Sequence, residues 1–285
     1  MAELRAGREA VTTADMVELR FDGVDDLDVA AALRDRGLPT IATCRPVWEG
    51  GRFDGSEEER RARLVEALAC GAEYVDVEWR AIREDGGLGG FGDLVRTHPS
   101  RVVVSAHDFD GIPADLCGQA RTMRAAGGAV IKMAITARRL SDTLPLIDLA
   151  RGGDAVVVGM GAAGVPSRLL ASRFGSRWTY AGAGVAPGQV PATRMIGGFR
   201  FRSIGPRTVL YGAVGPRVME SGVPERFNAA FAEAGVDAVC VPLCPADVDD
   251  LATFKSALGF AGVVNAGAAP DAIARLMTAW TEQAR

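Results

Sequence analysis

A lysine lies inside an apolar run, "AVIKMAI", at residues 129–135. The 32 basic residues of the chain include only two lysines, Lys132 and Lys255, and all the others are arginines. Both side chains are cations, but only a lysine amine loses its proton readily when it is buried and can then act as a nucleophile. Lys132 therefore indicates either imine chemistry on a carbonyl substrate or a lysine that extends from a strand end to solvent or to Glu78.

A histidine is the second candidate for chemistry, His107 in the run "RVVVSAHDF" at residues 101–109. The other histidine of the chain, His98, falls in a polar turn beside a proline. An imine-forming lysine needs a proton shuttle beside it, and the run with His107 directly precedes the run with Lys132. His107 is therefore either a general acid and base or a histidine packed for structural reasons.

Polar residues alternate along several of the apolar runs. Because successive side chains of a strand point to opposite faces, alternate residues share one face. The polar residues aligned in this way are Glu18, Arg20 and Asp22; Thr43 and Arg45; Asp76 and Glu78; Ser105 and His107. They gather towards the carboxyl ends of successive runs, where barrel enzymes build their sites, whereas a purely structural interior would carry Val, Ile and Leu. The pattern predicts a polar active site.

Seven short β-branched runs could position these side chains. They span residues 15–22, 39–45, 73–79, 101–109, 129–135, 154–160 and 177–183. Helix-like stretches separate them, such as residues 56–71, which open with a Ser-x-x-Glu capping box and close at Gly71. The alternation predicts an α/β fold with a parallel sheet, most economically a (β/α)8 TIM-type barrel, with one strand missing from the count.

The strand–helix alternation breaks at residues 191–206, which read as a helix and a linker. We predict a domain boundary there, with a barrel at 1–202 and a small C-terminal α/β unit at 203–285. Its expected strands are 208–215, 238–244 and 260–266, with helices at 224–235, between the last two strands and at 270–283.

Composition excludes several classes of protein. With 48% hydrophobic and 24% charged residues, the chain is typical of a globular protein. A net charge of −4 without a basic block argues against nucleic-acid binding. The charged start does not resemble a signal peptide, and the longest apolar stretch, at 155–165, is too short and Gly-rich to span a membrane. Five cysteines without CxxC spacing indicate reduced thiols. We expect a cytoplasmic protein with no membrane span and no structural zinc site.

A glycine motif, "GMGAAG" at residues 159–164, fits the dinucleotide pattern GxGxxG. Such a site also needs an acidic residue about 20 positions later. No Asp or Glu occurs between Asp154 and Glu220, whereas Arg168 and several other arginines do. The segment therefore indicates an anionic substrate, or else a tight turn with surface arginines.

Eight stretches together resemble a known family. They are "VELRFD", "TCRPVWEGG", "YVDVE", "VSAHDF", "IKMA", "MGAAGVPSR", "FGSRWTY" and "APGQ". In order and spacing they resemble the type I 3-dehydroquinate dehydratases of the shikimate pathway, which serves aromatic amino-acid biosynthesis. The resemblance covers residues 16–190 and implies the same barrel fold.

The resemblance also implies roles for individual residues. Lys132 would form an imine with the C3 ketone of 3-dehydroquinate, and His107 would remove the C2 proton and protonate the departing C1 hydroxyl. Glu49 would orient His107, and Arg168 would hold the substrate carboxylate. The remaining substrate ligands implied are Glu18, Arg20, Arg45 and Gln189. The reaction would need no cofactor and no metal.

Two departures from the family pattern stand out. Val185 replaces the serine that usually precedes Ala-Pro-Gly-Gln, so one hydroxyl contact to substrate is expected to be lost. Only "MAELRAGREAVTTAD" precedes the first matching strand, where the family places a whole further strand. Either the start codon is misassigned, or the barrel closes differently, or the site is impaired. Because the catalytic residues are present, we favour the first two explanations.

The C-terminal segment resembles the start of a shikimate dehydrogenase substrate domain, eroded in its motifs. Ser221, Pro224 and Asn228 fit the pattern Ser-x-Ser-Pro-x-x-His-Asn, but Val223 and Phe227 replace its second Ser and its His. The expected catalytic lysine position falls at a proline. We therefore expect no dehydrogenase activity and a degenerate packing or dimerisation module.

Two other functions are compatible with parts of the sequence. An imine-forming aldolase would explain Lys132 but not the ordered set of Glu49, His107, Arg168 and Gln189. A non-catalytic shikimate-type ligand-binding or regulatory protein, derived from a dehydratase–dehydrogenase fusion, would explain the short N-terminus. The leading hypothesis is a cytoplasmic, homodimeric 3-dehydroquinate dehydratase.

Overall fold

The computed structural model describes residues 13–84, 90–182, 188–215 and 217–267. Contacts within the chain divide it into two compact units. The first unit comprises residues 1–107 and 117–132, and the second comprises residues 108–116 and 133–285.

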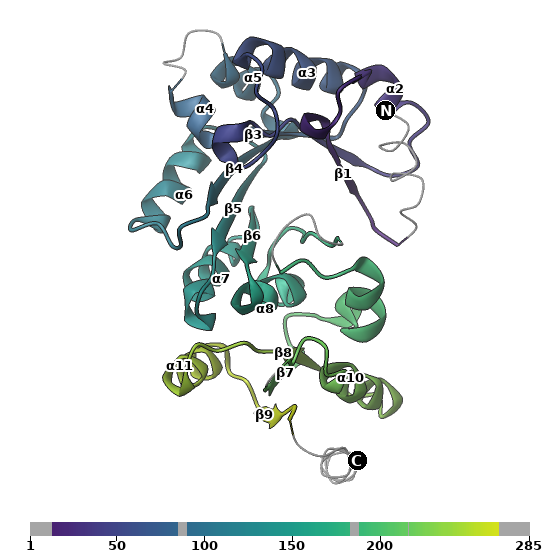
Figure 1. The fold of residues 1–285 in the computed structure, drawn as a ribbon, viewed down its shortest axis with the longest axis vertical. Helices are drawn as coiled ribbons and strands as arrows, with labels where there is room; N and C mark the ends of the chain where they lie inside the picture. Colours follow the sequence, from purple (N-terminus) through teal and green to yellow (C-terminus); the bar gives the residue numbers. More distant parts are fainter. Residues whose placement is uncertain (1–12, 85–89, 183–187, 216, 268–285) are drawn as a thin grey trace. The chain divides into compact units, whose positions relative to one another are not determined.

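A six-stranded sheet carries the predicted polar residues (Figure 1). Its strands are β1 (Val17–Arg20), β2 (Thr40–Thr43), β3 (Tyr74–Glu78), β4 (Val102–Asp108), β5 (Val130–Thr136) and β6 (Ala155–Met160), hydrogen-bonded in sequence order. The pairs β1–β2, β2–β3 and β3–β4 are parallel, and their register sets Arg20 beside Thr43, Thr43 beside Asp76 and Glu78 beside Ser105. The first six predicted strands and the parallel α/β class are therefore confirmed.

Helices of the first unit lie along one side of its strands (Figure 1). They are α2 (Val29–Leu33), α3 (Glu57–Ala69), α4 (Trp79–Glu84) and α5 (Phe91–Thr97), followed by α6 (Leu116–Ala125). The predicted capping box of α3 is present, because the Ser56 hydroxyl accepts from the Glu59 amide while the Glu59 carboxylate accepts from the Ser56 amide. Gly71 follows the end of this helix with a φ of 92°, as predicted.

The seventh predicted strand, residues 177–183, is not a strand over residues 177–182. The Arg177 amide donates to the Ala155 carbonyl at 2.9 Å, which is one bond of the expected ladder with β6. The Val157 amide then donates to the hydroxyl of Ser176 instead of to a backbone carbonyl, at 3.3 Å. Because the Ser176 hydroxyl accepts from the Val157 amide, the backbone hydrogen bonds between residues 177–182 and β6 do not continue. In the described ranges the sheet has six strands, with β1 and β6 at its two ends.

The second unit contains a further parallel sheet. Helices α7 (Leu144–Ala150), α8 (Val165–Leu169) and α9 (Ala171–Phe174) come first. Strands β7 (Val209–Val214), β8 (Ala238–Pro242) and β9 (Gly262–Asn265) then form a sheet in the order β8-β7-β9, with α10 (Val223–Glu233) and α11 (Val248–Leu258) between successive strands. All three predicted C-terminal strands are confirmed. The helix predicted at 270–283 lies outside the described residues.

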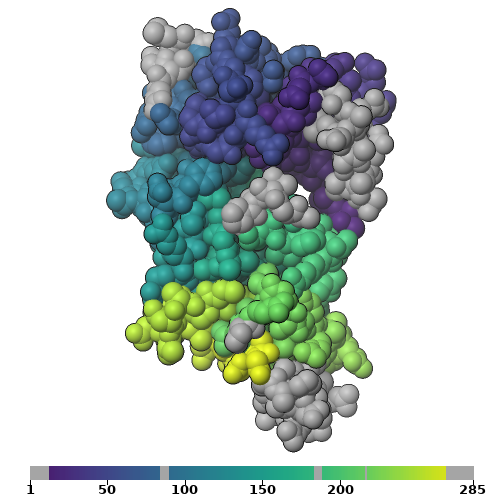
Figure 2. All heavy atoms as spheres, in the orientation of Figure 1, coloured from purple at the N-terminus to yellow at the C-terminus, as the bar shows by residue number. Residues whose placement is uncertain are grey.

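One apolar core joins the segments on either side of residue 203. Leu210, Val239 and Val241 on one face of the small sheet pack with residues of α7, α8 and α9 and with Phe254 of α11. Figure 2 shows the yellow-green α11 in contact with the teal atoms of the same unit. The predicted domain boundary at this position therefore remains a prediction.

Within the described ranges, every helix is too short or too polar to cross a lipid bilayer.

Candidate active site

Lys132 lies in β5 with 6% of its surface exposed. Its Nζ is 3.0 Å from Oδ2 of Asp76 and 3.7 Å from Oε1 of Glu18. The Thr43 hydroxyl donates to the same Glu18 oxygen at 2.6 Å. The lysine thus faces the carboxylates of Asp76 and Glu18 inside the protein, and little of its surface reaches solvent.

Asp76 is fully buried and accepts from three side chains. Besides Lys132, the Arg45 guanidinium contacts its Oδ1 at 2.8 Å, and the Ser105 hydroxyl donates to that oxygen at 2.5 Å. Burial alone would raise the pKa of Asp76, but the Arg45 and Lys132 cations outweigh it and hold the pKa well below its usual range. Asp76 is therefore ionised at neutral pH beside the lysine amine.

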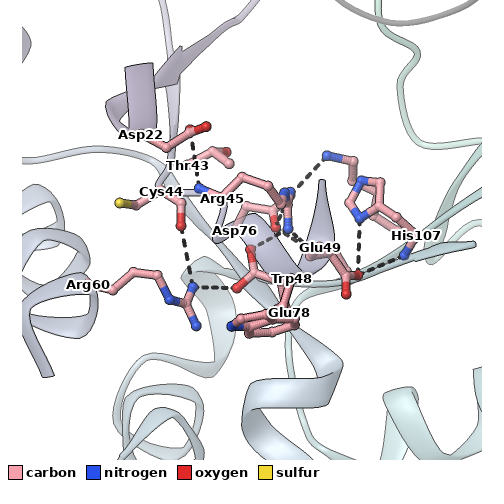
Figure 3. A network of polar contacts seen from close by, with 12 residues as sticks. Asp22, Thr43, Cys44, Arg45, Trp48, Glu49, Arg60, Asp76, Glu78 and His107 are labelled. Atoms are coloured by element: carbon pink, nitrogen blue, oxygen red, sulfur yellow. Dashed lines mark hydrogen bonds and ion pairs between the residues drawn. The ribbon is translucent and has the colours of Figure 1, made fainter. Parts of the chain in front are cut away.

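Arg45 occupies the centre of the buried network (Figure 3). Its guanidinium contacts Asp76, Glu78 and, at 2.9 Å, the Ser105 hydroxyl, with 3% of the residue exposed. These bonds use three of the five N–H donors of the guanidinium. The substrate contact that the sequence predicts for Arg45 stays a prediction.

Glu78 lies between two arginines. Arg45 contacts one of its oxygens, and Arg60 of α3 contacts the other. Burial raises the pKa of Glu78 and outweighs the opposing effect of the two cations. Figure 3 shows this carboxylate between the two guanidinium groups.

His107 and Glu49, the predicted acid–base residue and its orienting carboxylate, lie in contact. The Glu49 carboxylate accepts from the His107 amide at 2.8 Å and lies 3.3 Å from its Nδ1, which identifies Nε2 as the basic nitrogen when Glu49 is ionised. Burial, reinforced by Arg45 and Lys132, holds the pKa of His107 well below its usual range. Burial also raises the pKa of Glu49 to about 7. A neutral imidazole oriented by a carboxylate is suited to remove a proton.

Arg20 is held by Asp22, which lies just after the end of the same strand. Its Nε and terminal nitrogen donate to the two oxygens of Asp22 at 2.8 and 2.7 Å. Asp22 also accepts from the amides of Arg45 and Arg52, at 3.2 and 3.1 Å. With 36% of its side chain exposed, Arg20 is oriented yet accessible.

Arg168 and Gln189, the other predicted ligands, belong to the second unit. Arg168 is 2% exposed, and burial lowers the pKa of its guanidinium to about 10, so it remains a cation at neutral pH. The glycine motif before it forms a tight turn, since a Cβ on Gly159 would lie 2.6 Å from the Cα of Gly164. Val185 lies outside the described residues, and the substrate contacts of Arg168 and Gln189 stay predictions.

Sequence reasoning assigned no role to several residues of the buried charge network. Asp76, Glu78, Ser105 and Thr43 were aligned on strand faces, and this alternation was the signal that could have identified them. Arg60 gave no such signal, because charged residues in a run such as "EEERRAR" usually face solvent. In the described ranges no group of three or more His, Cys, Asp or Glu side chains is arranged to hold a metal ion.

The fold and site define an α/β protein in which a buried lysine, a neutral histidine and carboxylates converge at strand ends. Residues 2–206 match the family model for type I 3-dehydroquinase. The chain belongs to this family.

Relatives and solved structures agree with this family membership. The chain is 38% identical over 203 residues to the 3-dehydroquinate dehydratase of Methanothermobacter thermautotrophicus, covering 67% of this chain and 88% of that protein. It is 34% identical over 261 residues to the chloroplastic bifunctional 3-dehydroquinate dehydratase/shikimate dehydrogenase of Arabidopsis thaliana. That match covers 86% of this chain but only 42% of the plant protein.

The crystal structure of the Aquifex aeolicus 3-dehydroquinate dehydratase superposes with a TM-score of 0.56 at 28% identity, covering 70% of this chain and 91% of that one. The dehydroquinate dehydratase and shikimate dehydrogenase structure from S. pombe covers 92% of this chain and 54% of its own at 20% identity, with a TM-score of 0.54, which shows similarity of fold alone.

Proposed function

We propose that this chain dehydrates 3-dehydroquinate to 3-dehydroshikimate through an imine on Lys132. The observation that carries the proposal is the buried amine of Lys132, 3.0 Å from Asp76 in the same unit as the His107–Glu49 pair. Family membership supplies the substrate class. A lysine buried only for structure would not require a neutral, carboxylate-oriented histidine in the same unit.

The chemistry follows from these groups. The Lys132 amine adds to the C3 ketone, water leaves, and a protonated imine forms that withdraws electrons from C2. His107 takes the C2 proton, and the resulting enamine expels the C1 hydroxyl, which leaves as water with the proton from His107. Hydrolysis of the conjugated imine then releases the enone and restores the amine. Asp76 and Glu18 stabilise the positive charge on the lysine nitrogen throughout.

The remaining polar residues divide into substrate ligands and supporting groups. We assign Arg20 and Glu18 to the ring hydroxyls, because both are oriented and partly exposed. Arg168 and Gln189 keep their predicted roles as ligands of the carboxylate and a hydroxyl. Arg45 also has an electrostatic role, because its charge lowers the pKa of Asp76 and adds to burial, the larger cause, in lowering the pKa of His107.

The C-terminal segment is proposed to lack dehydrogenase activity. Asn228, which fits the dehydrogenase pattern, uses its side-chain amide on the backbone: it accepts from the Cys240 amide at 2.7 Å and donates to the carbonyls of Cys240 and Gly198. Ser221 is likewise engaged with the backbone of Val218 and Val223. These contacts support a structural use of the eroded motif. A homodimeric, cytoplasmic enzyme remains our expectation.

Trapping the imine tests the proposal. The purified protein is incubated with 3-dehydroquinate and borohydride, the adduct is mapped by peptide mass spectrometry, and enone absorbance is followed in parallel without borohydride. We expect a reduced adduct on Lys132 together with enone formation. An adduct without enone would contradict the assignment of His107, and a folded protein with neither would favour the non-catalytic ligand-binding alternative.

A further inference from the structure

Arg60 is a fully buried cation on a helix outside the strand ends, and it contacts no residue that the reaction uses directly. We propose that Arg60 is a positioning residue that fixes the segment from Cys44 to Glu49 and thereby holds Glu49 against His107. The inference rests on the proposed function, since it concerns the proton-transfer step of that reaction.

The contacts of Arg60 converge on both ends of this segment. At the beginning, its guanidinium donates to the Cys44 carbonyl at 3.4 Å, and it also contacts Glu78, which in turn holds the Arg45 side chain. At the end, its guanidinium carbon lies 5.8 Å from the centre of the Trp48 ring, directly before Glu49. Figure 3 shows Arg60, Trp48 and Glu49 around the same carboxylate network.

The guanidinium is itself held in place. Glu57, one turn earlier in α3, accepts from Nε at 3.2 and 3.1 Å and from a terminal nitrogen at 2.5 Å. The same Glu57 accepts from the Trp48 indole at 3.3 Å, so the carboxylate joins helix and segment a second time. Phe91 covers the guanidinium, with its ring centre 4.2 Å from the guanidinium carbon. A guanidinium that is packed and hydrogen-bonded in this way fixes the positions of its partners in addition to supplying a charge.

The segment needs an external support of this kind. Its turn is closed by backbone bonds, such as Val47 amide to Phe53 carbonyl at 2.9 Å, but these fix only its internal shape. The orientation of the turn relative to β4, where His107 lies, depends on contacts with other elements. Displacement of a catalytic group by about 1 Å can reduce turnover about 100-fold. Loss of Arg60 should therefore slow proton transfer more than imine formation.

A merely structural ion pair predicts something different. If Arg60 served only to join α3 to β3, its replacement would lower stability. The turnover of folded molecules, and the relative rates of imine formation and proton transfer, would stay unchanged. The contacts of Asp76 with Lys132 and Ser105 do not pass through Arg60. Imine formation is thus the internal reference against which the proton-transfer step can be measured.

The test compares Arg60→Met, Arg60→Lys and the double variant Arg60→Met/Glu78→Gln with the unchanged chain. Arg61→Met is the matched control, because Arg61 follows in the same helix and is partly exposed. The double variant avoids leaving an unpaired buried carboxylate, which could unfold the single variant. Each protein is measured for thermal unfolding, kcat and KM for enone formation, and the rate of borohydride-trapped adduct on Lys132.

For both methionine variants, we expect kcat to fall about 10- to 100-fold with little change in KM and with adduct formation largely retained. Arg60→Lys should fall between these and the unchanged chain, because an ammonium can replace the charge but not the fork. Arg61→Met should match the unchanged chain.

Three results would overturn the inference: kcat of the folded variants equal to that of Arg61→Met, equal losses in adduct formation and in enone formation, or unfolding of every Arg60 variant. The proposed function fails separately, and only if the unchanged chain forms neither adduct nor enone.

Discussion

The two units differ in how their buried charges are arranged. In the first unit a continuous chain of buried charges runs from the strand ends to α3 and comprises Lys132, Asp76, Arg45, Glu78 and Arg60. In the second unit, the strand faces of β7 and β8 carry Leu, Val and Ala, and their core consists of aliphatic and phenyl groups. The first unit therefore buries a connected network of charges beside its apolar residues, whereas the core around β7 and β8 is apolar.

This difference indicates that the buried charges serve the chemistry, whereas the apolar cores provide most of the stability. Buried charges are expensive to desolvate and add little net stability even when paired, so their presence indicates function. Apolar burial contributes stability without requiring an exact partner. Among the buried polar side chains of the second unit is Asp250, whose carboxylate accepts from the amides of Leu140, Ser141 and Ala246 at 2.9–3.0 Å. It attaches α11 to the loop that follows β5.

Replacing Lys132 by arginine is expected to have the largest effect, a loss of about 10⁴-fold or more in turnover. Arginine keeps the charge beside Asp76 but cannot form an imine, so the network should survive while the chemistry stops. Enone absorbance and thermal unfolding measure the two consequences. Lys255→Arg, exposed in α11, is the matched control. Appreciable turnover in Lys132→Arg would contradict the imine.

Asp76→Asn should lower the free energy of unfolding by about 3–5 kcal/mol at neutral pH, because it leaves buried cations without their shared anion. The folded chain holds the pKa of Asp76 below its unfolded value of about 3.9. Its contribution is therefore complete above that value and is lost progressively as the pH falls from there towards the lowered pKa. Urea titrations from pH 7 down to about pH 2 measure the beginning of this loss.

Asp54→Asn, at an exposed position of the same unit, controls for the loss of one charge. If Asp76→Asn unfolds with the same pH dependence as the unchanged chain, the buried network is not the source of acid sensitivity.

Phe254→Ala should weaken the apolar core of the second unit by about 3 kcal/mol or more in unfolding free energy. Phe254 is fully buried, and its ring centre lies 5.6 Å from that of Phe260. Turnover per folded molecule should stay close to that of the unchanged chain, which is the reverse of Lys132→Arg. Val248→Ala, on the same helix but 80% exposed, should change neither quantity. A loss of turnover without loss of stability would refute the division between the units.

Glu49→Gln is expected to reduce kcat/KM about 100-fold and to remove a pH dependence. Burial raises the pKa of Glu49 to about 7, so in the unchanged chain activity should rise with pH through about 7 as the carboxylate loses its proton and orients Nδ1 of His107. The neutral amide of glutamine does not titrate, so the rise of activity with pH near pH 7 should disappear. Glu58→Gln, exposed on α3, should retain this rise. If the rise persists in Glu49→Gln, a group other than Glu49 causes it.

Local patterns made much of the fold and site predictable. The positions of β1 to β6 follow from runs of β-branched residues, and the start of α3 follows from its Ser-x-x-Glu capping box. Alternation placed Asp76 and Glu78 on one face, where both contact Arg45. These features depend on residues close together in the chain, whose geometry a strand or helix sets directly.

The sequence by itself determined where β1 to β9 lie, which polar residues share a face, and that Lys132 and His107 are the candidates for chemistry. Only the tertiary structure decided that Lys132 pairs with Asp76, that Arg60 turns inward from its helix, and that the run at 177–182 loses its ladder to the Ser176 hydroxyl. It also decided that the C-terminal sheet shares its core with α7 to α9. The reason is physical: pairing between distant elements depends on which groups are desolvated together, and that is settled only when the elements pack.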